Sequence, residues 1–154
     1  MIIKTERLLL RPIALDDKYS IFEYRTDAET NKYQGWIPKT VEDAEAFIAK
    51  VAPQINEPNT WFQFVIIEKL SDKTIGDLGI HFFDAENKQA ELGITINKSY
   101  HGKGFAFEAL TSVINFLFDA LDKHRIIASI DPRNEKSIRL FEQIGFRKEA
   151  HFKE

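Results

Sequence analysis

The decisive stretch is YHGKGFAFEAL, residues 100–110, in which two glycines and a lysine come directly before a run with helical spacing. Apolar residues recur at intervals of three and four from Ala106 to Leu121, which predicts the longest helix of the chain. The glycines therefore lie at a helix N-terminus, where free backbone N–H groups and the helix dipole favour a phosphate or pyrophosphate ligand. Taken alone, the stretch fits a simple connection between a strand and a helix equally well.

Two familiar nucleotide-binding patterns do not fit this stretch. The phosphate-binding loop of nucleoside triphosphatases needs a glycine where Asn97 stands and a serine or threonine where Gly104 follows Lys103. The dinucleotide fingerprint needs a third glycine at the position of Phe107 and an acidic residue at the end of the next strand. The first pattern is therefore excluded, and the second is disfavoured.

Strands and helices alternate along the rest of the chain. β-branched and aromatic runs bounded by turn signals predict strands over 6–13, 61–69, 74–83, 89–97 and 124–131. Helical spacing and capping residues predict helices from Asp16 or Asp17 to about Arg25, from Thr40 to Pro58, over 106–121, and from Asn134 to Gly145. Hairpins early and strand–helix–strand units late predict an α/β fold of the α+β type, with a mixed sheet covered by helices on both faces.

Length and composition narrow the class of protein. The 154 residues suit one domain, 1–154, and a net charge of −3 with both signs mixed gives no basic surface for nucleic acid or a membrane. The absence of cysteine excludes disulfides, thiolate catalysis and zinc–cysteine sites. Charged residues interrupt the N-terminal apolar run, so no export signal is predicted and we expect a cytoplasmic protein.

No metal site is predicted from the sequence. The four histidines, at positions 81, 101, 124 and 151, include no pair at a spacing of four, and no serine lies in a G-x-S-x-G pattern. His81 and His124 are interpreted as strand or turn residues rather than as ligands.

Three blocks of sequence together resemble a known family. They are ELGITI before the glycine loop, HGKGFA within it, and DPRNEKSIRLFEQIGF at 131–146. With ERLLLRPI near the N-terminus, they make nearly the whole chain similar to the GCN5-related N-acetyltransferase (GNAT) superfamily. The ERLLLRP opening, the QAELGITI strand and the N-x-x-S-x-R-L-F-E-x-x-G-F block look most like the branch that acetylates ribosomal-protein N-termini, the RimJ/RimL type.

The resemblance implies a mostly antiparallel twisted sheet that splays open between the strands at 91–97 and 125–131, with acetyl-CoA in the gap. The loop would hold the CoA pyrophosphate on backbone N–H groups of His101, Gly102, Lys103, Gly104, Phe105 and Ala106. His101 departs from the glutamine or arginine usual in the family, which we expect to tune binding rather than abolish it. The pantetheine arm would be hydrogen-bonded by Ile94, Thr95 and Ile96 and lined on its far side by Asn134 and Phe141.

Acetyl transfer to an amine needs a neutral amine, a stabilised oxyanion and a protonated leaving thiolate. Glu91 alternates with the apolar residues of its strand, so its side chain should share the cleft face with Thr95. We expect Glu91 to act as base through a water, although the same spacing suits an ordinary solvated glutamate. The resemblance places Ser137 at the CoA sulfur as acid or donor, the alternative being a first-turn serine that satisfies backbone groups. A backbone N–H within 94–96 would meet the oxyanion.

The sequence leaves the amine acceptor open. An α-amine with a pKa near 8 is partly neutral at cytoplasmic pH, whereas freeing a lysine amine costs roughly 4 kcal/mol, so a modest base suits a peptide N-terminus. It suits a small amine such as a polyamine, an amino acid or an antibiotic equally, and an alternative of another class is a non-catalytic acyl-CoA sensor. Tyr33 and Trp36 are expected to line the acceptor site or, with equal weight, to act as lids over the core.

Members of the family continue after GFRKE with a hairpin and a last strand beside 125–131, whereas this sequence ends at Glu154. We expect that the last strand is missing through truncation. An uncovered edge at 125–131 would otherwise need a partner, for which a homodimer is one solution.

Overall fold

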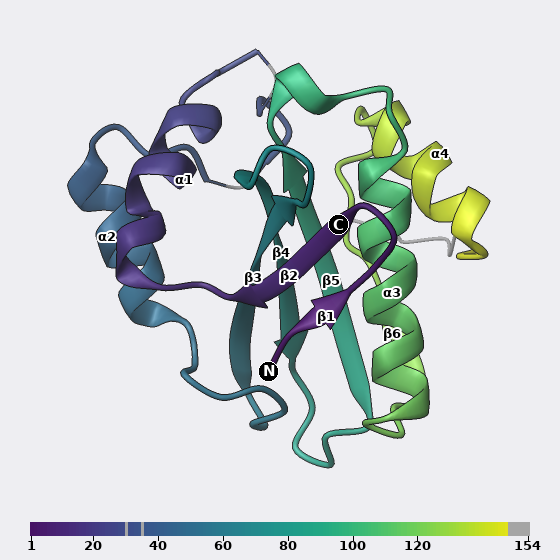
Figure 1. Ribbon diagram of the computed structural model, residues 1–154. Coiled ribbons are helices and arrows are strands. Elements are labelled where there is room, and N and C mark those ends of the chain that lie inside the picture. Colours follow the sequence, from purple (N-terminus) through teal and green to yellow (C-terminus); the bar gives the residue numbers. More distant parts are fainter. Residues whose placement is uncertain (30, 35, 148–154) are drawn as a thin grey trace.

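A single sheet of six strands forms the centre of the computed structural model, which describes residues 1–29, 31–34 and 36–147 (Figure 1). The strands lie in the order of the sequence, and neighbours pair antiparallel except for the last pair, which is parallel. The predicted mixed, mostly antiparallel sheet is therefore confirmed. Its strands are β1 Ile3–Lys4, β2 Leu8–Pro12, β3 Thr60–Glu68, β4 Lys73–Phe82, β5 Gln89–Ile96 and β6 Arg125–Ile127.

Helices cover both faces of the sheet, as the sequence predicts. Figure 1 shows α1 and α2 on one side of the strands and α3 and α4 on the other. Their bounds are α1 Lys18–Arg25, α2 Val41–Lys50, α3 Phe105–Asp119 and α4 Glu135–Ile144, with short 3-10 turns at Leu15–Asp17 and Lys98–Tyr100. Among the described residues, none of these helices is both long and apolar enough to cross a membrane.

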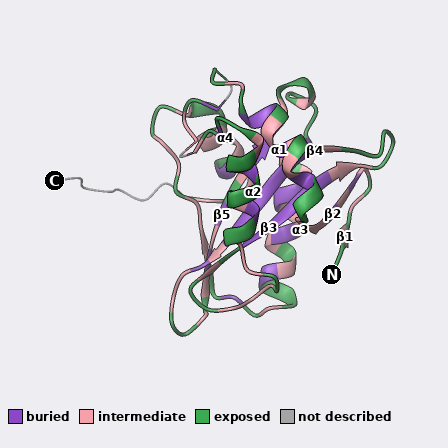
Figure 2. Ribbon diagram, turned by 90° about the vertical axis from the view of Figure 1, so that its left-hand side faces the viewer, coloured by how far each residue is buried: buried purple, intermediate pink, exposed green. Residues whose placement is uncertain are grey.

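The main core lies between α3 and the sheet. Alternate residues of the central strands point toward this helix, because successive side chains of a strand point to opposite faces. The helix contributes a stripe at intervals of three and four, Ala109, Leu110, Val113 and Leu117, all fully buried. Figure 2 shows buried segments running along the sheet while the outer sides of the helices are exposed. A second cluster, Ile21, Tyr24, Ala44 and Val65, joins α1 and α2 to the opposite face.

The starts of α2 and α4 follow their sequence signals, whereas Asp17 before α1 makes no side-chain cap because its carboxylate accepts hydrogen bonds from Arg11 and the Ala14 N–H. The Thr40 hydroxyl accepts the backbone N–H of Asp43, and the Asp43 carboxylate accepts the N–H of Thr40, which together form the expected capping box. The side chain of Asn134 accepts the backbone N–H of Ser137 at 3.3 Å and caps α4. Gly145 ends the same helix with φ +123°, a conformation that favours glycine.

Three predicted boundaries are wrong. In two of them, a hydrogen bond that the local sequence pattern does not reveal shortens the element. The strand predicted over 6–13 forms only over 8–12, as β2, since Thr5 N–H donates to the Leu8 carbonyl at 2.9 Å in a turn that folds β1 back onto β2. The helix predicted to reach Pro58 ends at Lys50, since Ala52 N–H donates to the Trp61 carbonyl at 2.7 Å instead of continuing the helix. The strand predicted over 124–131 pairs only over 125–127.

The parallel pair β5 and β6 parts soon after it forms. Gln89 faces Arg125, Ala90 faces Ile126 and Glu91 faces Ile127, and no later residue of β5 pairs with the described part of the chain after β6. The sheet is therefore open beside Leu92 to Ile96, which confirms the predicted splay.

A buried polar network joins α1 to the sheet on the face opposite the main core. Asp77 on β4 is fully buried and accepts hydrogen bonds from Arg25 Nη2 and Gln63 Nε2, each at 2.7 Å, and from the Tyr24 hydroxyl. Burial, together with the neighbouring Asp77 charge, raises the pKa of Tyr24 well above its ordinary value, so this hydroxyl keeps its proton and donates.

Replacing Asp77 by alanine is expected to lower the free energy of unfolding by about 3–5 kcal/mol, because it leaves the Arg25 charge buried without its carboxylate. Urea unfolding followed by circular dichroism measures the loss. The matched control is Glu29→Ala, which removes an exposed ion pair to Lys32 (3.0 Å) and should change stability little. Equal losses in the two variants would contradict this account of the network.

Candidate active site

The opening beside β5 exposes a row of backbone groups. Asn97 N–H donates to the Ile75 carbonyl at 2.7 Å, and hydrogen-bonded pairs alternate along an antiparallel ladder, so Leu92, Ile94 and Ile96 direct their backbone groups away from β4. Ile94 therefore presents its N–H and C=O groups, and Ile96 its N–H group, to the space that β6 has left. An open strand edge of this kind is suited to a ligand that carries amide groups.

The glycine loop lies at the end of this row and leads into α3. Gly102 and Gly104 have φ +75° and φ +80°, and Gly104 is the N-cap of the helix. Left-handed residues beside a helix N-terminus form the backbone concavity that binds anions, which is why glycine is needed at these two positions. The ring of His101 reaches back, with Nε2 2.7 Å from the Ile96 carbonyl oxygen. The residue that departs from the family pattern thus ties the loop to the open edge of β5.

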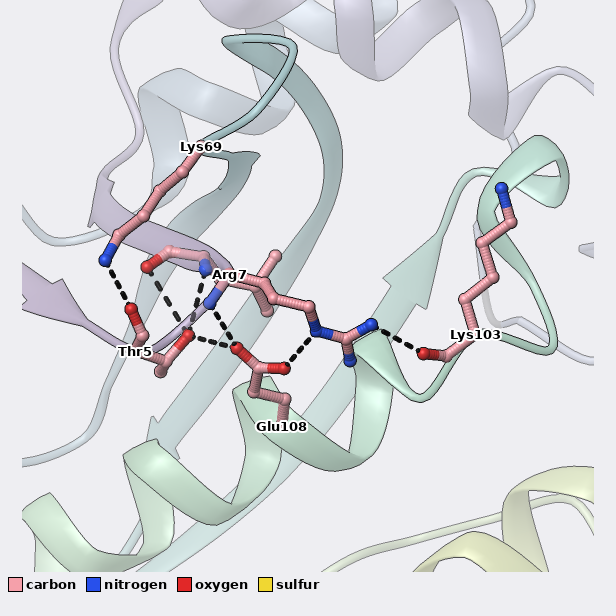
Figure 3. A network of polar contacts seen from close by, with 6 residues as sticks. Thr5, Arg7, Lys69, Lys103 and Glu108 are labelled. Carbon is pink, nitrogen blue, oxygen red and sulfur yellow. Dashed lines mark hydrogen bonds and ion pairs between the residues drawn. The ribbon is translucent and has the colours of Figure 1, made fainter.

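An ion-pair network fixes the loop from outside (Figure 3). Arg7 donates from Nε to Glu108 Oε1 at 2.7 Å and from Nη1 to the Lys103 carbonyl at 2.9 Å. Its backbone N–H and the Thr5 hydroxyl donate to Glu108 Oε2, and its guanidinium lies 4.3 Å from the centre of the Phe105 ring. Arg7 therefore holds both the loop and the first turn of α3. We call the contacts among Thr5, Arg7, Lys103 and Glu108 the loop latch.

Glu91, the predicted base, lies at the closed end of the opening. It occupies the last residue pair of β5 and β6, and its side chain is 21% exposed on the face away from the main core. Its Oε1 is 3.1 Å from Nδ1 of His81, the residue directly opposite on β4. The ring of His81 in turn stacks on Trp61 of β3, with centroids 4.5 Å apart and planes 6° from parallel. Sequence reasoning treated His81 as an ordinary strand residue and missed this pairing, which depends on strand register.

Two facing glycines lie on the face of the sheet that carries Glu91. Gly79 on β4 lies opposite Gly93 on β5, between the His81–Glu91 pair and the Asp77–Thr95 pair. A Cβ added at Gly93 would meet no atom within 4 Å, whereas one at Gly79 would lie 2.8 Å from the Gln63 side chain. This face of the sheet is therefore open above Gly93. At the far end, the Thr95 hydroxyl is buried and has no hydrogen-bond partner among the described residues.

The predicted residues of α4 lie at its first two turns. The backbone N–H of Ser137 is used by the Asn134 cap, while its hydroxyl has no hydrogen-bond partner in the described part of the chain. Phe141 is 4% exposed and packs edge-on against Phe146 with centroids 5.0 Å apart. It belongs to the main core, so its contact with a ligand stays a prediction.

The two aromatic residues predicted for the acceptor site have different surroundings. Trp36 stacks on Phe47 of α2 at 4.7 Å and lies 5.4 Å from the Arg25 guanidinium, so it packs on the second cluster as a lid would. Tyr33 lies 5.1 Å from the guanidinium of Arg133 and so reaches the loop that leads into α4. Gly35 between them and His151 lie outside the described residues.

The part of the chain that the structure describes contains no group of three or more histidine, aspartate or glutamate side chains placed to hold an ion.

Comparison with known proteins identifies the family. A model described as the acetyltransferase (GNAT) domain matches residues 7–147, which include the glycine loop, β5 and α4. The chain belongs to the GNAT acetyltransferase family. Acetyl-CoA is the acyl donor of this family, and the open edge of β5 with the anion-binding loop at its end fits a long amide-bearing thiol attached to a pyrophosphate.

Two relatives of this GNAT protein span nearly its whole length, and a third matches less than half of it. The N-acetyltransferase p20 of Bacillus licheniformis is 34% identical over 146 residues, covering 95% of this chain and 82% of the relative. A GNAT acetyltransferase structure from Bacillus anthracis has a TM-score of 0.85 at 32% identity, covering 99% of this chain and 87% of that one. The [ribosomal protein uS5]-alanine N-acetyltransferase of Escherichia coli is 40% identical over 63 residues, 41% of this chain and 32% of the relative.

The loop latch should make stability depend on pH. Burial by itself would raise the pKa of Glu108, but hydrogen bonds from Thr5 and Arg7 and the charge of Arg7 outweigh it and hold this pKa below its ordinary value of 4.5. The latch therefore stabilises the fold fully above that ordinary value, and its contribution is lost as pH falls through the lower pKa of the folded state.

Glu108→Gln should accordingly lower the thermal midpoint most at neutral pH, and the difference from wild type should shrink as the pH is lowered below about 4.5. Thermal unfolding of both proteins across a pH series measures it. Glu142→Gln, an exposed change on α4, serves as the control. A difference between wild type and Glu108→Gln that stays constant with pH would contradict the latch.

Proposed function

We propose that this GNAT protein transfers the acetyl group of acetyl-CoA to the N-terminal α-amine of a protein or peptide, by direct attack within a ternary complex. The observation that carries this proposal is the arrangement along β5: an anion-binding loop at one end, free backbone groups in the middle and Glu91 at the closed end. The similarity of part of the chain to a uS5-alanine N-acetyltransferase supports the α-amine as acceptor.

Acetyl-CoA would be held along this row of groups. Backbone N–H groups from His101 to Ala106 suit the pyrophosphate, and the backbone of Ile94 and Ile96 suits the pantetheine amides. Five residue steps separate Ile96 from Glu91, which is about 17 Å of extended strand. An extended pantetheine arm has this length scale, so a pyrophosphate at the loop would place the thioester near Glu91.

The chain's own residues would then supply what the transfer needs. Removal of the amine proton depends on the Glu91 carboxylate, and the hydroxyl of Ser137, free of other partners among the described residues, suits the leaving sulfur as a donor. A backbone N–H of the 94–96 segment can face the carbonyl oxygen as it gains negative charge. The acetyl group arrives activated as a thioester. With no cysteine in the chain, direct transfer is favoured over an acyl-enzyme.

The acceptor would lie over Gly93, on the face of the sheet that carries Glu91. A Cβ built at Gly93 meets no atom within 4 Å, and Trp61 on the same face is 43% exposed. Tyr33, which packs on Arg133, would contact an acceptor that extends toward α4. Because Gly93 is exposed, this face suits the end of a chain as acceptor. A small amine remains the alternative to be separated by experiment.

Acetyl-CoA binding tests the donor site. Calorimetric titration of the wild type should show binding to acetyl-CoA and none to ATP or NAD. Gly104→Asp should weaken binding by about tenfold or more, since like charges 4 Å apart repel by ~1 kcal/mol in water and ~4 kcal/mol near a protein surface. In Gly104→Asn the new residue must adopt the same positive φ but carries no charge, so acetyl-CoA binding should weaken less. Unchanged affinity in both variants would contradict a phosphate site at this loop.

A panel of acceptors tests the reaction. Mass spectrometry of N-terminal peptides, polyamines, amino acids and aminoglycosides incubated with acetyl-CoA should show acetylation of peptide α-amines, with turnover reduced in Glu91→Gln and Ser137→Ala. Acetylation of small amines alone would favour the alternative. A protein that binds acetyl-CoA and acetylates nothing, and whose two variants keep the same acetyl-CoA affinity, would be a sensor.

A further inference from the structure

His81 is the one titratable side chain in contact with Glu91 in the described part of the chain, and the mechanism above leaves it unused. Its Nδ1 is 3.1 Å from Glu91 Oε1. Its ring is held flat on the Trp61 indole and lies 5.8 Å from the ring of Phe83. The side chains of His81 and Glu91 are 29% and 21% exposed, so the pair reaches solvent on the face that carries Gly93. One hydrogen bond and one stacking contact together fix both the position and the plane of the imidazole.

The chemistry of the two groups determines where the imidazole proton lies. An ionised carboxylate only accepts hydrogen bonds, so Nδ1 must donate to Glu91. A neutral imidazole carries one proton, and its Nε2 is then left with a free lone pair. No described residue hydrogen-bonds this second nitrogen. A base whose other nitrogen is oriented by a carboxylate is the arrangement that activates amines and hydroxyls in many unrelated enzymes.

We propose that His81 Nε2 takes the proton from the bound acceptor amine, and that Glu91 acts as a positioning residue that holds the imidazole in this tautomer. This inference rests on the proposed acetyltransferase function and changes one role within it, since the sequence prediction has Glu91 as the base acting through a water. An imidazole suits the task better than a carboxylate, because its pKa in water, about 6.5 against about 4.3, lies closer to that of an α-amine.

The bound acceptor enters as an ammonium ion and gives one proton to His81 Nε2, which frees the nitrogen lone pair. That pair forms the bond to the acetyl carbon, the carbon–sulfur bond breaks, and its electrons leave on the CoA sulfur. As the amide forms, the second proton of the nitrogen passes through water or the Ser137 hydroxyl to the sulfur, which leaves as the thiol. His81 then releases its proton to solvent and returns to the neutral form.

Glu91 is the charged side chain that hydrogen-bonds His81. Trp61 on β3 and Phe83 farther along β4 are uncharged, and Gly79 and Gly93 bring no side chain to the face. Arg125 on β6 lies on the same face opposite Gln89 and donates to its Oε1 at 3.2 Å, while Asp77 is paired with Arg25. Glu91 should therefore stabilise the imidazolium that forms when the proton arrives.

The tautomer is tested without any acceptor. Long-range proton–nitrogen correlation spectra of the labelled protein, at a pH where the ring is neutral, should show His81 protonated at Nδ1 and unprotonated at Nε2. In Glu91→Ala the ring should revert toward the Nε2-protonated form that free histidine favours. A wild-type ring protonated at Nε2 would overturn the proposal.

Kinetics test the base, using the acceptor that the panel above identifies. His81→Gln should lower kcat at neutral pH by about 100-fold or more. Its activity should recover at high pH, where the amine loses its proton to solvent, so the acid limb of the profile moves up into the range of a free α-amine. Glu91→Gln should lower kcat less and move the acid limb to lower pH, because the imidazolium loses its stabilising charge. The control, His124→Gln, replaces an exposed histidine and should leave the profile unchanged.

The outcomes separate this inference from the function on which it rests. Calorimetry with acetyl-CoA first confirms that each variant retains the donor site. A His81→Gln enzyme with the kcat and pH profile of an active wild type would overturn the role of His81 alone. A wild type that binds acetyl-CoA but acetylates no amine would overturn the proposed function, and this inference with it.

Discussion

The parting of β5 from β6 is the constraint on which the rest of the site depends. The two strands share three residue pairs and then separate after Glu91 and Ile127. A sheet that closes along its whole length satisfies its own backbone groups, whereas this one leaves those of Ile94 and the N–H of Ile96 to an outside partner. A ligand with amide groups that filled this edge would offset its cost. The glycine loop at one end of the opening and the His81–Glu91 pair at the other both lie along it.

Two polar networks, both remote from the opening, fix the segments on either side of it. The loop latch ties the glycine loop and the first turn of α3 to the start of β2, through one arginine that contacts both. The Asp77 network ties α1 to β3 and β4 on the other face. Both networks join segments remote in the sequence, so the loop and the acceptor side are positioned by the sheet rather than by their own local structure. This arrangement lets the loop keep two left-handed glycines without becoming a loose turn.

The sequence predicts the parts of this architecture that depend on local periodicity. Alternation in β3, β4 and β5, the helical stripe of α3 and the caps at Thr40 and Asn134 follow from neighbouring residues and are confirmed. The end of α2 was missed because Ala52 bonds Trp61 rather than its own helix. The loop latch and the His81–Glu91 pair were missed for the same reason, since one spans 101 positions and the other depends on hairpin register. Family resemblance located Glu91, but only the structure shows what it touches.

Amide hydrogen exchange with and without acetyl-CoA tests whether the donor occupies the unpaired edge of β5. Exchange at Ile94 and Ile96 should slow markedly when acetyl-CoA binds, because their N–H groups face the opening. Gly93 and Thr95, whose N–H groups face β4, provide the reference within the same strand and should change far less. Binding that leaves Ile94 and Ile96 as exchangeable as before, or that slows all four amides alike, would contradict the account.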